Sequence, residues 1–211
     1  MAGAPSFCAV ILAAGESSRM GTDKALLLWP PGALGQTLLS AAIESLNDFS
    51  DMVIVVAGKN APNLTPVVYT NAAFLVKNPA PERGQFSSLQ IGLQEVLNRG
   101  RDAAIITLVD RPPVRPSTLQ ALCEAFAARA HETWSLIPEY QGKHGHPFFV
   151  SREMIHAFCA APPTANAQEI EHEHQNHIEY VAVDDPAVTL NVDTPEDYAA
   201  LSSSPSVYKT K

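Results

Sequence analysis

Residues 9–28 read AVILAAGESSRMGTDKALLL. The run opens with four apolar residues, 9–12, which are typical of a strand buried on both faces. It continues into a loop of small residues, 13–18, and Arg19 and Lys24 follow that loop five residues apart. Small residues let backbone N–H groups approach a phosphate chain closely, and fixed cations neutralise the charge of that chain. The stretch therefore predicts a strand followed by a loop that can hold a nucleoside triphosphate.

The bulk properties of the chain fit a globular protein. Its 211 residues suit one α/β domain over residues 1–201, followed by a tail over 202–211 that we expect to be disordered. The 46% of hydrophobic and 17% of charged residues are ordinary for a folded domain. The net charge of −8 argues against sequence-independent binding of nucleic acid, which needs a basic surface.

Cysteine spacing and hydropathy argue against several further classes of protein. The three cysteines are widely spaced and form no CxxC pair, so the pattern indicates neither a disulfide framework nor a zinc site. The first residues lack the basic region and apolar core of a signal peptide, and no apolar run reaches membrane-spanning length. We therefore expect a soluble, cytoplasmic protein without a membrane or nucleic-acid partner.

Strand and helix signals alternate along the chain. Strands are expected over residues 7–12, 52–57, 103–109, 134–138, 147–150 and 178–183, with weaker candidates at 67–69 and 74–77. Helices are expected over residues 36–46, 87–97, 117–130, 154–159 and 194–201. This alternation predicts a three-layer α/β/α, Rossmann-like fold with a mostly parallel sheet. Ligands on such sheets bind beyond the carboxyl ends of strands, where both the first loop and Asp110 are expected.

The first loop differs from the two common phosphate-binding loops. The pattern GxGxxG is absent, and Gly15 and Gly21 are too far apart for GxxxxGKS and lack an adjacent lysine. What remains, L-A-A-G-x-S-x-R-M-G-x-x-K, resembles the signature of the MobA-like nucleotidyltransferases, which include molybdenum cofactor cytidylyl- and guanylyltransferases. More distant relatives in this group are the sugar-nucleotide pyrophosphorylases. The resemblance implies a nucleotide-binding role for Leu12, Ala13, Ala14, Gly15, Arg19 and Lys24.

Four further segments match the same family in the same order. They are N-P at 78–79 with Gly84 and S-S-L at 87–89, V-D-R-P at 109–112, Y-Q-G at 140–142 with G-H-P at 145–147, and N-V-D-T-P-E-D at 191–197. The resemblance implies that Asn78, Gly84, Ser87 and Ser88 contact the nucleotide, and that Tyr140, Gly145, His146 and Pro147 bind the acceptor. It also implies that Asp110 and Asp193 bind Mg²⁺, and that Arg19, Lys24 and Asp110 are catalytic.

The residue types suit this chemistry. Transfer of a nucleotidyl group is an in-line attack on the α-phosphate, during which charge grows on phosphoryl oxygens. Mg²⁺ takes oxygen ligands, and Asp110 and Asp193 can supply two of them, while Arg19 and Lys24 suit the phosphates. No general base stands out, and none is required when the attacking group is already a phosphate. Taken singly, the two aspartates would also suit turn or capping positions.

Finer features of the resemblance indicate which nucleotide and which acceptor the protein uses. Position 14 is alanine, where guanylyltransferases of the family usually carry glycine, and this favours the smaller base of CTP. We therefore expect transfer of CMP from CTP to a phosphorylated acceptor, with molybdopterin favoured, pyrophosphate released and the product passed to a molybdoenzyme. Two other interpretations stay open. The acceptor could be an isoprenoid or sugar phosphate, or the protein could be a non-catalytic nucleotide sensor or molybdopterin chaperone.

A histidine-rich run at 171–177, EHEHQNH, is interpreted as a solvated surface segment. Its histidines at i and i+2 do not share a helix face, which disfavours a metal site.

Overall fold

The computed structural model describes residues 6–17, 20–32 and 35–202. Within these ranges eight strands form one sheet, with β8 paired to β5 and the others in the order β3-β2-β1-β4-β7-β5-β6. The strands are β1 Phe7–Ala13, β2 Met52–Ala57, β3 Phe74–Lys77, β4 Ala103–Leu108, β5 Ser135–Tyr140, β6 Lys143–His144, β7 Phe148–Ser151 and β8 Ile178–Ala182. Neighbouring strands among β1 to β4 are parallel, as are β5 and β8, while β7 runs antiparallel to both β4 and β5. The sheet is therefore mostly parallel.

Strand β1 lies in the middle of this sheet and is buried on both faces. Phe7, Ala9 and Ile11 belong to one apolar cluster, whereas Val10 and Leu12 belong to another. This period of two is the geometry of a strand, whose successive side chains point to opposite faces. The continuous apolar run at the start of the chain is thus explained by two cores, one on each side of the sheet.

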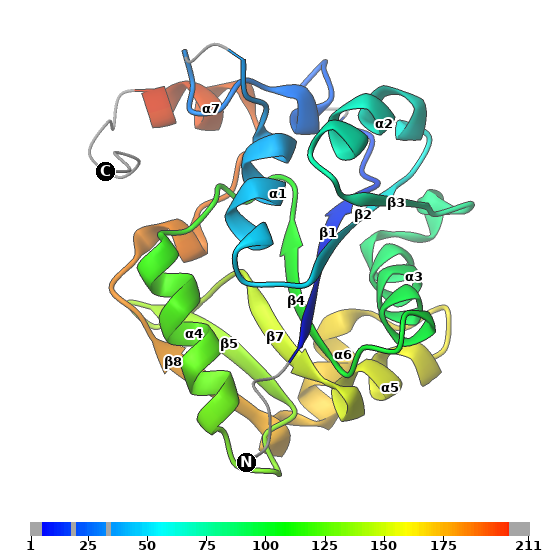
Figure 1. The fold of residues 1–211 in the computed structure, drawn as a ribbon, viewed down its shortest axis with the longest axis vertical. Coiled ribbons are helices and arrows are strands. Elements are labelled where there is room, and N and C mark those ends of the chain that lie inside the picture. Colours follow the sequence, from blue (N-terminus) through cyan, green and yellow to red (C-terminus); the bar gives the residue numbers. More distant parts are fainter. Residues whose placement is uncertain (1–5, 18–19, 33–34, 203–211) are drawn as a thin grey trace.

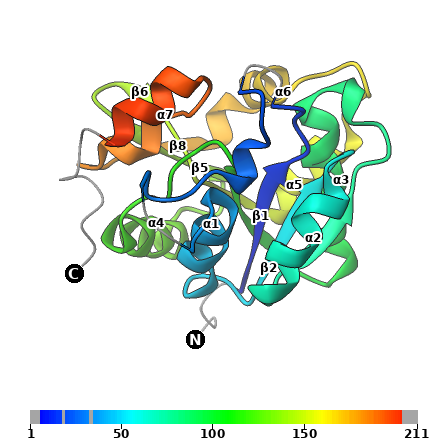
Figure 2. The ribbon, with the colours of Figure 1, turned by 90° about the horizontal axis from the view of Figure 1, so that it is seen from above.

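Helices cover both faces (Figures 1 and 2). On one face the helices α1 Leu38–Asn47, α2 Ala61–Thr70 and α4 Pro116–Ala128 pack on the sheet, and on the other α3 Gln85–Asn98, α5 Arg152–Ala160 and α6 Ala167–Glu173 do so. The last helix, α7 Pro195–Ser202, lies beside the first loop region, where the Tyr198 hydroxyl donates a hydrogen bond of 2.6 Å to the Leu28 carbonyl (Figure 1). These layers confirm the three-layer α/β fold that the alternating pattern predicts.

Two local predictions differ from the structure. Residues 67–69 were expected as a weak strand, and this is wrong, because they form the last turns of α2. Leu64 and Val68 lie one turn apart and are fully buried, so packing on the sheet outweighs the strand preference of the β-branched residues. The polar run 171–177 begins inside a helix that the sequence pattern missed, since α6 extends to Glu173.

The carboxyl ends of β1 and β4 lie side by side. Leu12 pairs with Leu108 in the parallel register, and the Val109 N–H donates to the Leu12 carbonyl at 3.0 Å. The loop after β1 and Asp110 after β4 therefore leave the sheet at the same edge. No helix in the described ranges is long and apolar enough to cross a bilayer. Residues 203–211, most of the predicted tail, lie outside the described residues.

Candidate active site

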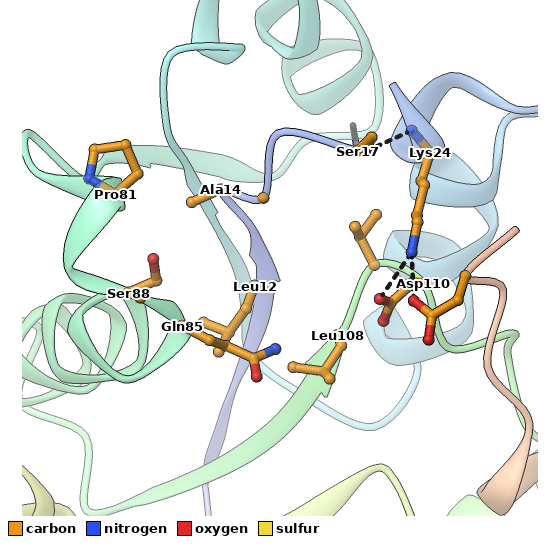
Figure 3. A pocket seen from close by; sticks show the side chains of 13 residues that line it. Leu12, Ala14, Ser17, Lys24, Pro81, Gln85, Ser88, Leu108 and Asp110 are labelled. Atoms are coloured by element: carbon orange, nitrogen blue, oxygen red, sulfur yellow. Dashed lines mark hydrogen bonds and ion pairs between the residues drawn. The ribbon is translucent and has the colours of Figure 1, made fainter. Parts of the chain in front are cut away.

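A cavity of about 320 Å³ lies at this edge of the sheet, between the loop after β1 and the start of α3 (Figure 3). Its wall brings together eight of the residues predicted from the sequence, which come from five separate segments. They are Leu12, Ala14, Gly15, Lys24, Gly84, Ser88, Asp110 and Asp193. Figure 3 shows the charged side chains on one side of the cavity and Ser88, Gln85 and Pro81 on the other.

Lys24 lies between the two carboxylates that the sequence assigns to a metal ion. Its Nζ is 2.7 Å from Asp193 Oδ1 and 3.5 Å from Asp110 Oδ2, and its side chain is only 10% exposed (Figure 3). The backbone brings these aspartates together, because the Val192 N–H donates to the Asp110 carbonyl at 2.9 Å. Residues 83 positions apart in the chain thus share one charged centre, and Lys24 in this structure contacts the carboxylates.

The segment before α7 orients Asp193. The Asn191 side-chain amide donates to Asp193 Oδ2 at 2.6 Å. Asp197 Oδ2 accepts the backbone N–H groups of Asp193 and Thr194 at 3.0 and 2.8 Å, in the manner of a helix cap. These backbone donors lower the pKa of Asp197 below its ordinary value of 3.8. The V-D-T-P-E-D motif therefore fixes the direction in which Asp193 faces.

A second network, which sequence reasoning missed, holds the loop after β1. The Asn60 side-chain amide donates to the Ala13 carbonyl at 2.9 Å and to Asp23 Oδ2 at 2.8 Å, and its oxygen accepts the Gly58 N–H at 3.0 Å. Asp23 Oδ1 also accepts the Ala25 N–H at 3.1 Å and so caps the short helix Lys24–Leu26. An aspartate directly before a short helix is a recognisable capping pattern in the sequence, but the hydrogen bond from Asn60 to Asp23 depends on the tertiary structure.

The arrangement fits a divalent cation. Asp110 Oδ1 is buried and has no hydrogen-bond partner among the described residues. Buried carboxylate oxygens are normally paired, so this atom is available to a ligand. In the described ranges no group of three or more His, Cys, Asp or Glu side chains is arranged to bind a metal. Such a cation would therefore take two carboxylates from the protein and its remaining oxygens from substrate and water, as Mg²⁺ commonly does.

On the opposite side, Asn78 organises the start of α3. Its side chain is buried, and its amide donates to Ser87 Oγ and Ser88 Oγ, both at 2.9 Å. Ser88 lines the cavity, whereas Asn78, Ser87 and Ala13 lie behind the wall. Gly84 precedes the helix with a φ of 92°, a left-handed value that favours glycine. Asn78 and Ser87 therefore position the wall of the cavity, and contact between them and a nucleotide stays a prediction.

A second cavity of about 560 Å³ adjoins the first and shares Leu12, Gly84, Gln85 and Leu108 with it. Gly145 and His146 line this second cavity, together with Arg111 and His144. Two other residues predicted to bind the acceptor lie elsewhere. Tyr140 packs against the core, and Pro147 lines a small hollow between α1 and the turn at residues 111–114.

His146 is held as a neutral imidazole. Burial and the nearby Arg111 guanidinium lower the pKa of His146 to about 3, and its Nδ1 is buried without a hydrogen-bond partner among the described residues. The side chain of Arg111 is itself held in place, because its Nη1 donates hydrogen bonds to the Leu190 and Thr189 carbonyls at 3.0 and 3.3 Å. Gly145 is sterically required, because a Cβ there would lie 2.1 Å from the Val188 carbonyl oxygen.

One predicted catalytic residue, Arg19, lies outside the described residues, as does its neighbour Ser18. The loop is described up to Ser17, whose hydroxyl oxygen accepts the Lys24 backbone N–H at 3.1 Å.

Comparison with known proteins identifies the family. The model of the MobA-like NTP transferase domain matches residues 9–178, most of the chain. The chain belongs to the MobA-like NTP transferase family. It is accordingly a nucleotidyltransferase, as the sequence motifs indicate.

Individual members of the MobA-like family resemble the chain over much of its length. The molybdenum cofactor cytidylyltransferase of Escherichia coli strain K12 is 25% identical over 193 residues, which span 90% of this chain and 92% of that protein. A probable molybdenum cofactor guanylyltransferase of Natranaerobius thermophilus is 30% identical over 144 residues, spanning 67% of this chain and 63% of that protein. Among solved structures, Rv0371c of Mycobacterium tuberculosis H37Rv in complex with manganese has a TM-score of 0.75 at 26% identity, covering 94% of this chain and 99% of that one.

Proposed function

We propose that the chain catalyses the Mg²⁺-dependent transfer of CMP from CTP to the terminal phosphate of molybdopterin, with release of pyrophosphate. In this reaction an oxygen of the acceptor phosphate forms a bond to the α-phosphorus of CTP, and the bond from that phosphorus to the β-phosphate oxygen breaks. The acceptor phosphate is already deprotonated at neutral pH, so the reaction needs no general base.

The observation that carries the proposal is the charged centre of Lys24, Asp110 and Asp193 in a cavity that joins a second one. Donor and acceptor need adjacent sites, because the attacking oxygen must approach the α-phosphorus in line with the leaving group. The first cavity suits the nucleotide, whose phosphates would lie near Gly15 and Lys24. The second cavity, with Arg111 and His146 near the shared wall, suits the acceptor.

Asp110 and Asp193 are the residues that would hold the metal ion. A bound divalent ion neutralises charge on the phosphates and stabilises the departing pyrophosphate. The free Asp110 Oδ1 supports this assignment, and so does the manganese complex of the Mycobacterium tuberculosis relative. Lys24 would then offset part of the negative charge that the triphosphate brings to the two aspartates.

Ala14 supports CTP over GTP. It lines the first cavity, where its methyl group reduces the room for a purine. The relative from Escherichia coli, which the alignment covers almost completely, is named a cytidylyltransferase. We further propose that one catalytic unit spans β1 to α7, because Lys24 and Asp193 complete the same site. A molybdoenzyme would take up the product.

The test is pyrophosphate release with each of CTP, GTP, ATP and UTP, in the presence of Mg²⁺ and purified molybdopterin. We expect release with CTP, and none when either Mg²⁺ or molybdopterin is left out. Release with GTP instead of CTP would contradict the interpretation of Ala14. Absence of release with all four nucleotides would refute the reaction with molybdopterin.

Two parallel measurements separate the remaining candidates. If the acceptor were an isoprenoid or sugar phosphate, those compounds would support release in the same assay where molybdopterin does not. If the protein were a non-catalytic chaperone, it would bind CTP and molybdopterin by calorimetry while releasing no pyrophosphate with any acceptor.

A further inference from the structure

Helix α6 forms the outer wall of the second cavity. The helix begins with a reciprocal cap, in which Asn166 Oδ1 accepts the Glu169 N–H at 3.0 Å and a Glu169 carboxylate oxygen accepts the Asn166 N–H at 3.1 Å. Ile170 is buried in the core and anchors the helix to α5 and the sheet. Ala167 and Glu171 lie one turn apart, and both line the second cavity. The fold thus places a carboxylate in the cavity wall.

Glu171 differs from the other two glutamates of α6. Glu169 is used in the cap, and Glu173 is exposed. Glu171 is half-buried, and its carboxylate forms no hydrogen bond or ion pair with any described residue. Burial raises the pKa of Glu171, which reflects the cost of holding an unpaired charge away from water. A ligand with N–H donors would offset that cost.

The rest of the cavity wall suits a flat heterocycle. Apolar side chains from four strands and from α3 contribute to it: Leu12, Phe86, Leu89, Ile106, Leu108, Ile137 and Phe148. The cationic Arg111 lies next to Asp110 in the chain, on the side of the reacting phosphates. A molecule that fits would therefore combine a planar ring bearing N–H donors with an anionic group at its other end.

We propose that Glu171 recognises the ring of the acceptor, by accepting hydrogen bonds from the two adjacent N–H groups of a 2-amino-4-oxopyrimidine edge. This edge carries an exocyclic amine beside a ring N–H, and a carboxylate can accept from both at once. Pterins carry this edge, so the inference deepens the proposed function, on which it rests. It makes Glu171 a specificity-determining residue, separate from the metal and phosphate groups.

The test uses a matched pair of fluorescent probes, 6-hydroxymethylpterin and 6-hydroxymethyllumazine. The two differ at position 2, where the lumazine has a carbonyl oxygen in place of the amine. The wild-type protein should bind the pterin at least about tenfold more tightly, since the lumazine loses one charge-assisted hydrogen bond and places an acceptor against the carboxylate.

A matched pair of variants identifies the residue responsible. Glu171→Gln keeps the shape of the side chain but offers one donor and one acceptor, which complement the O2 and N3–H of lumazine. We expect this variant to lose the pterin preference and to favour lumazine. Glu173→Gln, on the exposed part of the same helix, should keep the wild-type preference.

The outcomes separate the inference from the proposed function. If molybdopterin supports pyrophosphate release but Glu171→Gln leaves the pterin preference intact, the Glu171 assignment is overturned and the reaction stands. If molybdopterin supports no release yet the pterin preference depends on Glu171, the reaction is overturned and the ring recognition stands. Equal binding of both probes by the wild-type protein overturns the assignment.

Discussion

Opposing charges define the site at the scale of single residues. Asp110 and Asp193 lie on the same side of the cavity and would repel each other, and the ammonium of Lys24 between them reduces that repulsion. The side chain of Lys24 is nearly buried, so few water molecules screen these contacts. Each of the three groups thus changes the electrostatic environment of the other two, and substitutions here should act on charge more than on packing.

Asp110→Asn should reduce nucleotidyl transfer by at least about a hundredfold, because it removes the charge of a proposed metal ligand while keeping the shape of the side chain. The measurement is kcat/KM for pyrophosphate release. Asp184→Asn, at an exposed aspartate, is the control and should keep wild-type turnover. An Asp110→Asn variant with wild-type turnover would remove this residue from the metal site.

Gly15→Ala should leave folding intact and weaken nucleotide binding. A Cβ at this position would meet no atom within 4 Å, and the residue has no left-handed φ, so the melting temperature should stay unchanged. A methyl group would nevertheless hold the phosphates away from the backbone N–H groups and lower the affinity for CTP about tenfold. Calorimetry with CTP and Mg²⁺ measures the affinity. A loss of thermal stability without a change in affinity would contradict this role.

At the scale of elements, α3 packs closely on the sheet, and its first turn forms one wall of the first cavity. A Cβ at Gly92 would lie 2.6 Å from Val10 Cγ1 and 3.0 Å from Val56 Cγ2, so the helix lies as near to β1 and β2 as glycine allows. Asn78 then fixes the first turn of α3 by donating hydrogen bonds to Ser87 and Ser88. The wall that α3 contributes to the first cavity is therefore positioned from within the core.

Gly92→Ala should destabilise the protein by roughly 1–3 kcal/mol, because the buried valines of the strands cannot move aside. The better helix propensity of alanine, about 1 kcal/mol, offsets part of this cost. Urea unfolding measures the free energy of unfolding, and Gln94→Ala on the exposed face of the same helix is the control. A Gly92→Ala variant more stable than wild type would show that α3 can shift outward.

Asp197→Ala should loosen the start of α7 and thereby weaken metal binding at Asp193. Because backbone donors lower the pKa of Asp197, its contribution to stability is present above pH 3.8 and is lost as the pH falls below that value. The melting temperatures of variant and wild type should therefore differ at neutral pH and converge in acid. A difference that persists unchanged in acid would refute the capping role.

At the scale of the whole molecule, segments from both ends of the chain meet at one edge of the sheet. The loop after β1 supplies Gly15 and Lys24, the turn after β4 supplies Asp110, and the segment before α7 supplies Asp193. The second cavity adds His146 from the turn between β6 and β7, together with α6. Stability of the fold and integrity of the site are thus linked, since unfolding either end of the chain separates Lys24 from Asp193.

The pH dependence of global stability should reveal the lowered pKa of His146 in the folded protein. Its pKa in the folded state is about 3 and its ordinary value 6.5, so the unfolded chain binds a proton more readily between these values. Stability therefore falls as the pH drops from 7 to 5, with His146 contributing roughly 1–2 kcal/mol of that loss. His146→Gln should remove this part of the slope in urea unfolding measured at several pH values. An identical slope in both proteins would show that the imidazole has the same pKa in the folded and the unfolded chain.

The fold class and eight of the residues that line the first cavity could be predicted from the amino-acid sequence. Hydrophobic periodicity identifies strands and helices because buried positions recur along the chain with the period of each element. The ordered motifs then identify Gly15, Lys24, Asp110 and Asp193 as site residues. Which of these side chains contact each other follows from the three-dimensional packing instead. The position of Lys24 between two aspartates and the contact of Asn60 with Asp23 join residues distant in sequence, and Glu171 lines the second cavity together with residues distant from it. Such contacts depend on how helices pack across the sheet, and no local pattern in one chain encodes that geometry.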